Sequence, residues 1–259
     1  YIQLPSETGA EVKSFLGDDQ RNGVWFYGEE LSRHRTKLDG YRCVMTTPDC
    51  EALYYHRVLG MRGVNTSWKA QLRYKLMYHR YAKMSSEYPK GENFKYHLVG
   101  KEDAQFLRAL NPGIDARFIH HPHYDVVEKT VAVGMPIRLL IAGRYDFYMQ
   151  QAVDEAAQAI ASVASEIKDK YLITCLGKNL YKPADKRVKA GYKVEVKVFV
   201  DDYAAEVASH DIQLTPITVG TGTKGKVLDA LANGLMVIGT LRALENINVE
   251  SSKECVLYD

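Results

Sequence analysis

The chain has 259 residues, of which 46% are hydrophobic and 25% charged, an ordinary globular composition for one large domain or two small ones. Its formal net charge is +2, so the balance of charge alone excludes no class of partner. No apolar run reaches the roughly 18 residues of a membrane span and no signal peptide is present, so the sequence predicts neither a transmembrane nor a secreted protein.

The four cysteines, Cys43, Cys50, Cys175 and Cys255, form no CxxC pair. Four cysteines in a chain of this length do not make a disulfide scaffold, so we expect reduced thiols in a cytoplasmic protein. The chain begins with Tyr instead of Met and ends directly after a predicted strand. We therefore expect a sequence that is truncated at both ends.

The first part of the chain, residues 1–133, is Tyr-rich and basic and predicts an α/β domain that is shorter than a complete wound domain. Short apolar segments predict strands, and longer amphipathic ones predict helices. The predicted strands are Gly23–Tyr27, Tyr41–Thr46, His97–Val99 and Arg117–His120, and the predicted helices are Ala52–Leu59, Trp68–Met84 and Lys101–Leu110.

One stretch of this part, residues 52–86, contains no Asp or Glu but many basic and aromatic side chains. Such a block can face anionic lipid, nucleic acid or a phosphorylated substrate, or it can be a solvated helix face. Within it, Trp68, Leu72 and Leu76 form a stripe at helical spacing, which usually marks a core face. A peripheral contact with the inner face of a membrane is the alternative, and we expect no nucleic-acid partner, although salt-sensitive binding would support one.

The second part, residues 134–259, alternates apolar strands with helices, which predicts a parallel sheet wound on both faces. Gly and Pro at residues 134–136 predict a linker before it. The predicted strands are Ile137–Ala142, Tyr171–Leu176, Val194–Val200, Asp211–Pro216, Leu235–Gly239 and Lys253–Tyr258. The predicted helices are Asp146–Ile167, Tyr203–Ser209 and Lys226–Asn233, the last ending at Gly234.

The segment from Asp211 to Val227 predicts a phosphate site. It reads as an apolar strand, a glycine-rich turn over Gly220–Lys226 and a helix. This order brings free backbone N–H groups and the positive end of a helix to one point, and glycine lets the backbone approach a ligand closely. Lys224 and Lys226 add positive charge. We therefore expect this turn to bind the phosphates of a nucleotide.

Two other motifs overlap the same turn. Gly220–Gly225 has the GxGxxG spacing of an NAD-dependent oxidoreductase, but Thr240 stands near the place, about 20 positions later, where that motif needs an acidic residue. Gly220–Lys226 is close to a P-loop, but Val227 replaces the Ser or Thr that binds magnesium. An oxidoreductase and a non-catalytic nucleotide-binding module remain the alternatives.

A longer stretch resembles the donor-binding signature of GT-B glycosyltransferases and is most similar to their retaining family 4, the glycosyl transferases group 1. The signature is Pro216-x-x-x-Gly220-x-Gly222-x-Lys224-x-Lys226-Val-Leu-Asp229-Ala-Leu-Ala-x-Gly234-x-x-Val237-Ile-x-Thr240. The flanking segments Ile137–Gly143, Leu172–Gly177, Val198–Tyr203 and Asp211–Pro216 resemble the family in the same order. The resemblance therefore covers residues 137–259, with weaker similarity at His97–Asp103 and Phe118–Asp125.

The resemblance implies an α/β fold with two Rossmann-like domains of the GT-B type, the N-terminal one incomplete. It implies a hexosyltransferase that moves a sugar from a nucleotide-diphosphate sugar to a glycan or lipid-linked acceptor. Retention of configuration, independence of metal and a role in bacterial surface polysaccharide synthesis follow from the same resemblance. The nucleotide sugar is a co-substrate, and no cofactor is implied.

The candidate donor-binding residues lie at the predicted carboxyl ends of strands and around the glycine-rich turn, where cations and N–H groups can stabilise a leaving diphosphate. They are Gly143, Arg144, Lys178, Asp202, Tyr203, Gly220, Thr221, Gly222, Thr223, Lys224, Lys226 and Asp229. The resemblance implies that Asp229 meets the ribose and that Lys178, Asp202 and Tyr203 flank the base. Thr221 stands where family 4 usually has its first glutamate, so the contacts with the donor sugar differ from the usual ones.

The candidate catalytic residues are Lys226 and Asp49. Asp49 follows a predicted strand and precedes a predicted helix, so it either caps that helix or faces the cleft near the acceptor. The run His120–His123 contains three histidines, but their spacing is poor for a tetrahedral site. We therefore expect no bound metal.

Overall fold

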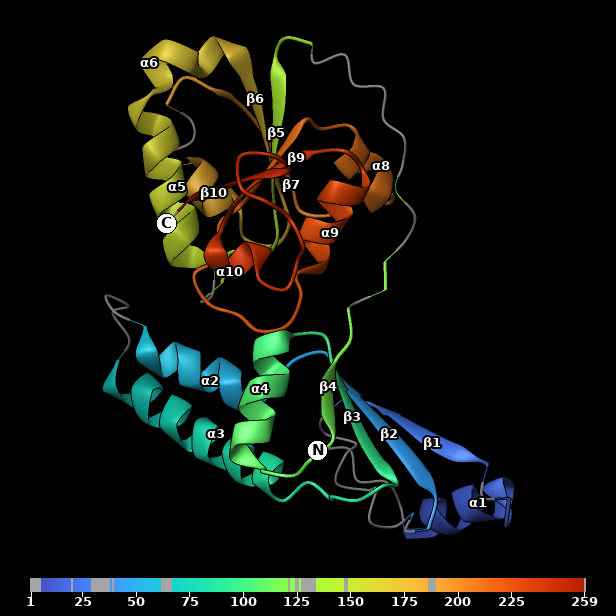
Figure 1. The fold of residues 1–259 in the computed structure, drawn as a ribbon. Coiled ribbons are helices and arrows are strands. Elements are labelled where there is room, and N and C mark those ends of the chain that lie inside the picture. The colour runs from blue at the N-terminus through green and yellow to red at the C-terminus, as the bar shows by residue number, and fades with distance from the viewer. Residues whose placement is uncertain are drawn as a thin grey trace. The chain divides into compact units, whose positions relative to one another are not determined.

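The structure, a computed structural model, describes residues 6–19, 21–28, 38, 40–61, 67–120, 122–123, 126, 134–146, 149–185 and 190–258 (Figure 1). The contacts between residues divide the chain into two compact units. One contains Tyr1–His121 with Thr221–Thr223, and the other contains Pro122–Gly220 with Lys224–Asp259.

The first unit is built on a four-stranded parallel sheet in the order β1-β2-β3-β4. The strands are β1 (Gly23–Tyr27), β2 (Arg42–Thr47), β3 (Phe94–Leu98) and β4 (Ala116–Phe118), and the helices are α1 (Ser6–Leu16), α2 (Glu51–Gly60), α3 (Trp68–Ser86) and α4 (Lys101–Leu110). The core contains the fully buried Leu98 and Leu107. Helices α2 and α3 lie side by side (Figure 1), and the stacked rings of Tyr55 and Tyr81 lie 5.7 Å apart between them.

Helix α3 exposes the face that was predicted to be buried. Trp68, Leu72 and Leu76 are 71%, 50% and 61% exposed, so the stripe expected to be core faces solvent. The packed side carries tyrosines instead, among them Tyr74 and Tyr81, whose rings meet Tyr55 of α2. The large half-polar tyrosine rings suit this contact, which explains why an aliphatic stripe was a poor guide to the buried face.

The second unit is built on a six-stranded parallel sheet in the order β10-β9-β8-β5-β6-β7. The strands are β5 (Ile137–Ala142), β6 (Tyr171–Leu176), β7 (Lys193–Lys197), β8 (Ile212–Thr215), β9 (Met236–Thr240) and β10 (Cys255–Tyr258). The helices are α5 (Gln150–Ser162), α6 (Ala164–Ile167), a 3₁₀ turn at Lys168–Lys170, α7 (Tyr181–Pro183), α8 (Tyr203–Ala208), α9 (Gly225–Ala232) and α10 (Leu241–Leu244). Within this unit α5 covers one face of the sheet and α8 and α9 the other (Figure 1).

The strand order places a topological switch at β5. The chain runs from β5 outward through β6 to β7, and then returns to β8 on the other side of β5 and runs outward to β10. Buried apolar residues such as Leu140, Ile173 and Val237 make these strands the centre of the core. In wound α/β sheets, ligands bind beyond the carboxyl ends of the strands at such a switch.

Several predicted elements differ from the structure. The helix predicted from Asp146 to Ile167 begins later and is interrupted: α5 begins at Gln150, α6 ends at Ile167, and Val163 lies between them. The strand predicted to reach Val200 ends at Lys197, because the residues after it form a cavity wall instead of pairing. Helices α1, α7 and α10 were not predicted.

Three findings limit the chemistry of the part of the chain that is described. All four cysteines are buried and none forms a disulfide. No described helix is both long enough and apolar enough to cross a bilayer. Among the same residues, no group of three or more His, Cys, Asp or Glu side chains is placed to hold a metal ion.

Candidate nucleotide-binding site

The carboxyl ends of β5, β6 and β7 in the second unit surround a cavity of about 310 Å³. Its wall combines backbone at strand ends, three cationic side chains and several apolar ones. The lining residues are Ala142, Gly143, Arg144, Leu176, Gly177, Lys178, Val198, Phe199, Val200, Tyr203 and Lys226. Five predicted donor-binding residues, Gly143, Arg144, Lys178, Tyr203 and Lys226, therefore lie together at one cavity.

Two glycines let the strand ends come close enough to form the floor of this cavity. Gly143 has φ 147° and Gly177 has φ 131°, in the region that favours glycine. A Cβ on Gly177 would lie 1.9 Å from the carbonyl oxygen of Gly143. The N–H of Gly143 donates to Leu176 O at 2.9 Å and the N–H of Gly177 donates to Lys197 O at 2.7 Å. The three strand ends are thus tied together directly beneath the cavity.

Lys226, in the first turn of α9, provides the cation at this floor. Its Nζ lies 3.5 Å from Ala142 O and 3.3 Å from Met149 Sδ, and a Cβ on Gly143 would lie 2.8 Å from it. Burial lowers the pKa of Lys226, with Lys224 adding to the effect and Asp146 opposing it. A partly desolvated ammonium beside a helix N-terminus is an arrangement that favours an anionic ligand.

The rim of the cavity carries two more exposed cationic side chains. Arg144 follows β5 and its Nε lies 3.7 Å from Asp146 Oδ2. Lys178 follows β6, and its carbonyl accepts a hydrogen bond from the N–H of Tyr145 at 3.0 Å. Because exposed cations keep most of their hydration, these two residues contribute less to the field at the floor than Lys226 does.

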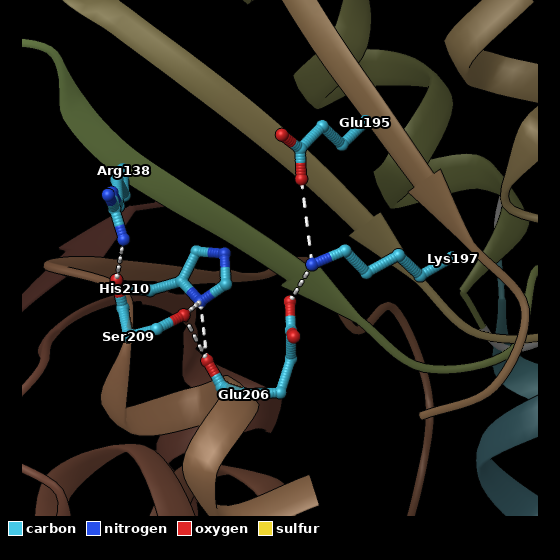
Figure 2. Close-up of polar contacts among 6 residues, drawn as sticks. All are labelled: Arg138, Glu195, Lys197, Glu206, Ser209 and His210. Carbon is cyan, nitrogen blue, oxygen red and sulfur yellow. Dashed lines mark hydrogen bonds and ion pairs between the residues drawn. The ribbon is translucent and has the colours of Figure 1, made fainter. Parts of the chain in front are cut away.

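The segment from Val198 to Val200, which follows β7, forms one wall of the cavity. An ion pair holds its two flanks together, since Lys197 Nζ lies 2.7 Å from Glu206 Oε1 of α8 and 3.5 Å from Glu195 Oε2 (Figure 2). The hydrogen bond that Lys197 donates to the Glu206 carboxylate raises the pKa of Lys197. This pair closes the loop between β7 and α8 and so supports the wall.

The carboxyl end of α8 is fixed by a second group of hydrogen bonds, also visible in Figure 2. His210 Nδ1 donates to Glu206 O at 2.7 Å, and Ser209 Oγ donates to the same carbonyl at 2.8 Å. Arg138 of β5 donates to Ser209 O at 3.2 Å. Burial lowers the pKa of His210, so the neutral ring with its proton on Nδ1 suits this position.

Asp202 and Asp229 lie near the cavity but do not line it. Asp202 is the N-cap of α8 and its Oδ1 accepts from Ala205 N at 2.9 Å, which orients the adjoining Tyr203. Asp229 pairs with His123, whose Nε2 lies 3.0 Å from its Oδ1, with both side chains largely buried. A ribose hydroxyl would therefore have to share or displace this contact. His123 was considered as a metal ligand, not as a partner of Asp229.

The glycine-rich turn is divided between the units. Gly220 and Lys224 belong to the second unit, and a Cβ on Gly220 would lie 3.1 Å from Lys224 Cε, so the lysine side chain folds back over the turn. Gly222 has φ 64°, which requires glycine or a strained residue. Thr221 and Thr223 group with the first unit, as Gly222 does, and none of the three lines the cavity.

Asp49 lies in the first unit, after β2, and does not line the cavity of the second. The expectation that it caps α2 is wrong, because the N-cap is Cys50 and has no side-chain cap bond. The carboxylate that serves this helix start is Asp103 from α4, whose Oδ1 accepts from Cys50 N at 2.8 Å. Burial raises the pKa of Asp103, which is fully buried.

Several cavity residues were not predicted as site residues: Gly177, Val198, Phe199 and Val200. Gly177 directly follows a predicted strand, which is a usable signal for a ligand site, whereas the other three belong to a predicted strand. Met149 contacts Lys226, but no sequence pattern around Met149 predicts this contact.

The fold defined by these two parallel-sheet units is that of solved GT-B glycosyltransferases. WaaG, a glycosyltransferase involved in lipopolysaccharide biosynthesis, matches with a TM-score of 0.57 and 16% identity, over 82% of this chain and 62% of WaaG. Anabaena Alr3699/HepE in complex with UDP matches with a TM-score of 0.63 and 10% identity, over 97% of this chain and 68% of that one. The pneumococcal O-GlcNAc transferase GtfA, in complex with UDP and GlcNAc, matches with a TM-score of 0.62 and 12% identity, over 97% of this chain and 49% of that one.

Residues 136–257, which lie in the second unit, match the family model described as Glycosyl transferases group 1. No curated protein matches the sequence significantly. The chain spans 62%, 68% and 49% of the three solved chains, so it corresponds to part of their length.

Proposed function

We propose that this protein transfers a sugar from a nucleoside-diphosphate sugar to a glycan or lipid-linked acceptor, and that the cavity of the second unit binds the donor. The observation that carries the proposal is the position of Lys226. Its ammonium lies at the floor of a cavity formed by strand ends, beside the first turn of α9, and burial lowers its pKa. The match of residues 136–257 to a glycosyltransferase family supports the same assignment.

In this proposal the cationic floor stabilises the leaving group. Breaking the bond between the sugar and the diphosphate builds negative charge on the departing phosphate oxygens. Lys226 Nζ and the positive N-terminal end of α9 are preorganised to neutralise that charge without a metal. Arg144 and Lys178, which line the same cavity, add further positive charge, and Lys224, the N-cap of α9, is proposed to do the same.

The apolar wall is the proposed place of the base. Phe199, on the loop between β7 and α8, and Tyr203, the first residue of α8, both line the cavity, and aromatic rings can stack on a base. Several solved structures of similar fold are complexes with UDP, which supports a UDP-sugar as the donor here. Asp229 is proposed to reach the ribose, exchanging part of its contact with His123 for hydroxyl groups.

The proposal extends to the acceptor side and to the outcome of the reaction. Asp49 of the first unit is the proposed acceptor-side carboxylate. Retention of configuration and a role in surface polysaccharide synthesis rest on the family resemblance, and WaaG is a related case involved in lipopolysaccharide biosynthesis. The anomeric configuration of the product, determined by nuclear magnetic resonance, would test retention directly.

A thermal-shift panel with UDP, GDP, ADP, NAD and ATP–magnesium, each with and without EDTA, tests the donor assignment. A ligand at 100 times its dissociation constant stabilises by about 2.7 kcal/mol. We expect stabilisation by one nucleoside diphosphate that EDTA does not change. Stabilisation by NAD alone would indicate an oxidoreductase instead. Donor binding without release of the nucleotide in the presence of acceptors would indicate a non-catalytic binding module.

A further inference from the structure

Helix α3 presents an apolar stripe to solvent. Trp68, Leu72 and Leu76 follow one another at intervals of four residues, which keeps them on one face because each such step turns by only about 40° beyond a full turn. All three are exposed, although Trp and Leu are normally among the more buried residues. Three large apolar side chains in line on one exposed helix form a patch, not isolated surface residues.

Cations border this stripe on both sides and no acid lies among them. Lys69, Arg73 and Lys75 are exposed beside the apolar residues, and Lys69 Nζ lies 5.7 Å from the centre of the Trp68 ring. Residues 52–86 contain no Asp or Glu. The first acid after the helix in the sequence is Glu87, whose Oε1 lies 3.9 Å from Lys83 Nζ.

The chemistry of this face fits a bilayer surface better than the other partners. A nucleic acid would use the cations, but it offers no partner to an aliphatic stripe of Leu72 and Leu76. A bilayer interface takes both parts: apolar side chains enter the boundary of the acyl chains, Trp sits at the headgroup level, and cations pair with anionic lipids. Lys side chains can also lay their stems along apolar surface while the charge stays in water.

We propose that the exposed face of α3, from Trp68 to Lys83, is a docking surface for a membrane rich in anionic lipids. The helix lies along the interface and does not cross it, in agreement with the absence of a described helix that could span a bilayer. The proposal does not depend on the donor cavity, since α3 belongs to the first unit and the cavity to the second.

Co-sedimentation with vesicles tests this surface. One preparation is an equimolar mixture of phosphatidylcholine and phosphatidylglycerol, and the other is phosphatidylcholine alone. We expect binding to the mixed vesicles that salt weakens, and much weaker binding to the neutral ones. The triple variant K69Q/R73Q/K75Q should bind about a hundredfold more weakly, at about fivefold for each cation removed. The matched variant K168Q/K170Q/K182Q, with three exposed lysines of the second unit replaced, should bind like the wild type.

Tryptophan fluorescence gives an independent measurement, because the chain has only two tryptophans, Trp25 on β1 and Trp68 on α3. In W25F the emission of Trp68 should shift to the blue on addition of mixed vesicles, and brominated lipid should quench it. In W68F the emission of Trp25 should do neither. Circular dichroism of each variant establishes that it is folded.

The proposal is overturned if the wild type binds neutral and mixed vesicles equally, if the two triple variants bind alike, or if Trp68 shows no shift while Trp25 does. Binding to duplex DNA in place of vesicles, lost in K69Q/R73Q/K75Q, would also overturn it and assign the face to nucleic acid.

Discussion

Substitution of Lys226 by Met should weaken nucleotide binding while it stabilises the free protein. Methionine keeps most of the apolar stem and removes the charge. A charge-assisted hydrogen bond to a phosphate contributes about 1.5–3 kcal/mol, so loss of the ammonium should raise the dissociation constant for UDP about 10- to 150-fold. Isothermal titration calorimetry of wild type and K226M measures this directly.

The effect on the free protein has the opposite sign. Because the pKa of Lys226 is lowered from 10.5 in the folded state, the unfolded chain binds this proton more tightly. The wild type should therefore gain stability relative to K226M as the pH rises through the folded pKa toward 10.5. At neutral pH, K226M should resist urea at least as well as the wild type, since it no longer places a charge in a partly dehydrated site.

Lys178 provides the matched control, because it lines the same cavity but is exposed. K178M should change the dissociation constant by no more than about fivefold, the upper range for an exposed charge. If K226M binds UDP within threefold of the wild type, or if K178M loses as much affinity as K226M, the assignment of the diphosphate to the Lys226 floor is wrong.

Three further predictions concern the second unit and are measured by urea unfolding. Gly177→Ala should lower the free energy of unfolding by more than about 3 kcal/mol, because the new Cβ would lie 1.9 Å from Gly143 O. The control Gly191→Ala should lower it by about 1–2 kcal/mol, because its Cβ meets only the flexible Lys168 side chain, at 3.0 Å. Equal losses of stability in the two variants would refute the close approach of Gly177 to Gly143. Tyr258→Phe should stabilise the protein by about 1 kcal/mol, because the buried Tyr258 hydroxyl lacks a hydrogen bond and burial raises the pKa of Tyr258 to about 12. The control is Tyr192→Phe, since Tyr192 and Tyr258 line one apolar cavity of about 320 Å³; it should lose about 1 kcal/mol of stability with the hydrogen bond to Ile160 O. A destabilised Y258F would show that the Tyr258 hydroxyl does have a favourable contact. Burial lowers the pKa of His210 from 6.5, so the wild type should lose stability as the pH falls below 6.5 toward the folded pKa. His210→Gln should flatten this dependence of stability on pH. If the dependence is the same in the variant, His210 is not its cause.

The short, mostly apolar strands β5 and β6 were predictable. Both begin and end as predicted, since Pro136 and Gly143 bound the first and Lys170 and Gly177 bound the second. The strand predicted as Val194–Val200 extends beyond the observed end of β7 for a similar reason. Val198, Phe199 and Val200 have strong β-propensity, but in the structure they line the cavity. Local propensity does not show where a strand loses its hydrogen-bonding partner.

The candidate site was predictable where it follows from strand ends. Gly143, Arg144 and Lys178 each come after a buried strand, and parallel strands bring such positions together. The partners of acidic residues were not predictable, because they come from distant sequence. Asp229 meets His123, and Asp103 instead of Asp49 serves the start of α2. The exposed stripe of α3 also shows that helical spacing identifies a face without telling whether it is buried.

A crystal structure with UDP would show whether the cavity at the ends of β5, β6 and β7 is a nucleoside-diphosphate site. We expect a diphosphate oxygen within hydrogen-bond distance of Lys226 Nζ, near the first turn of α9, with the uracil ring against the wall that carries Phe199 and Tyr203. UDP bound elsewhere on the protein, with Lys226 still in contact with Ala142 O and Met149 Sδ, would contradict it.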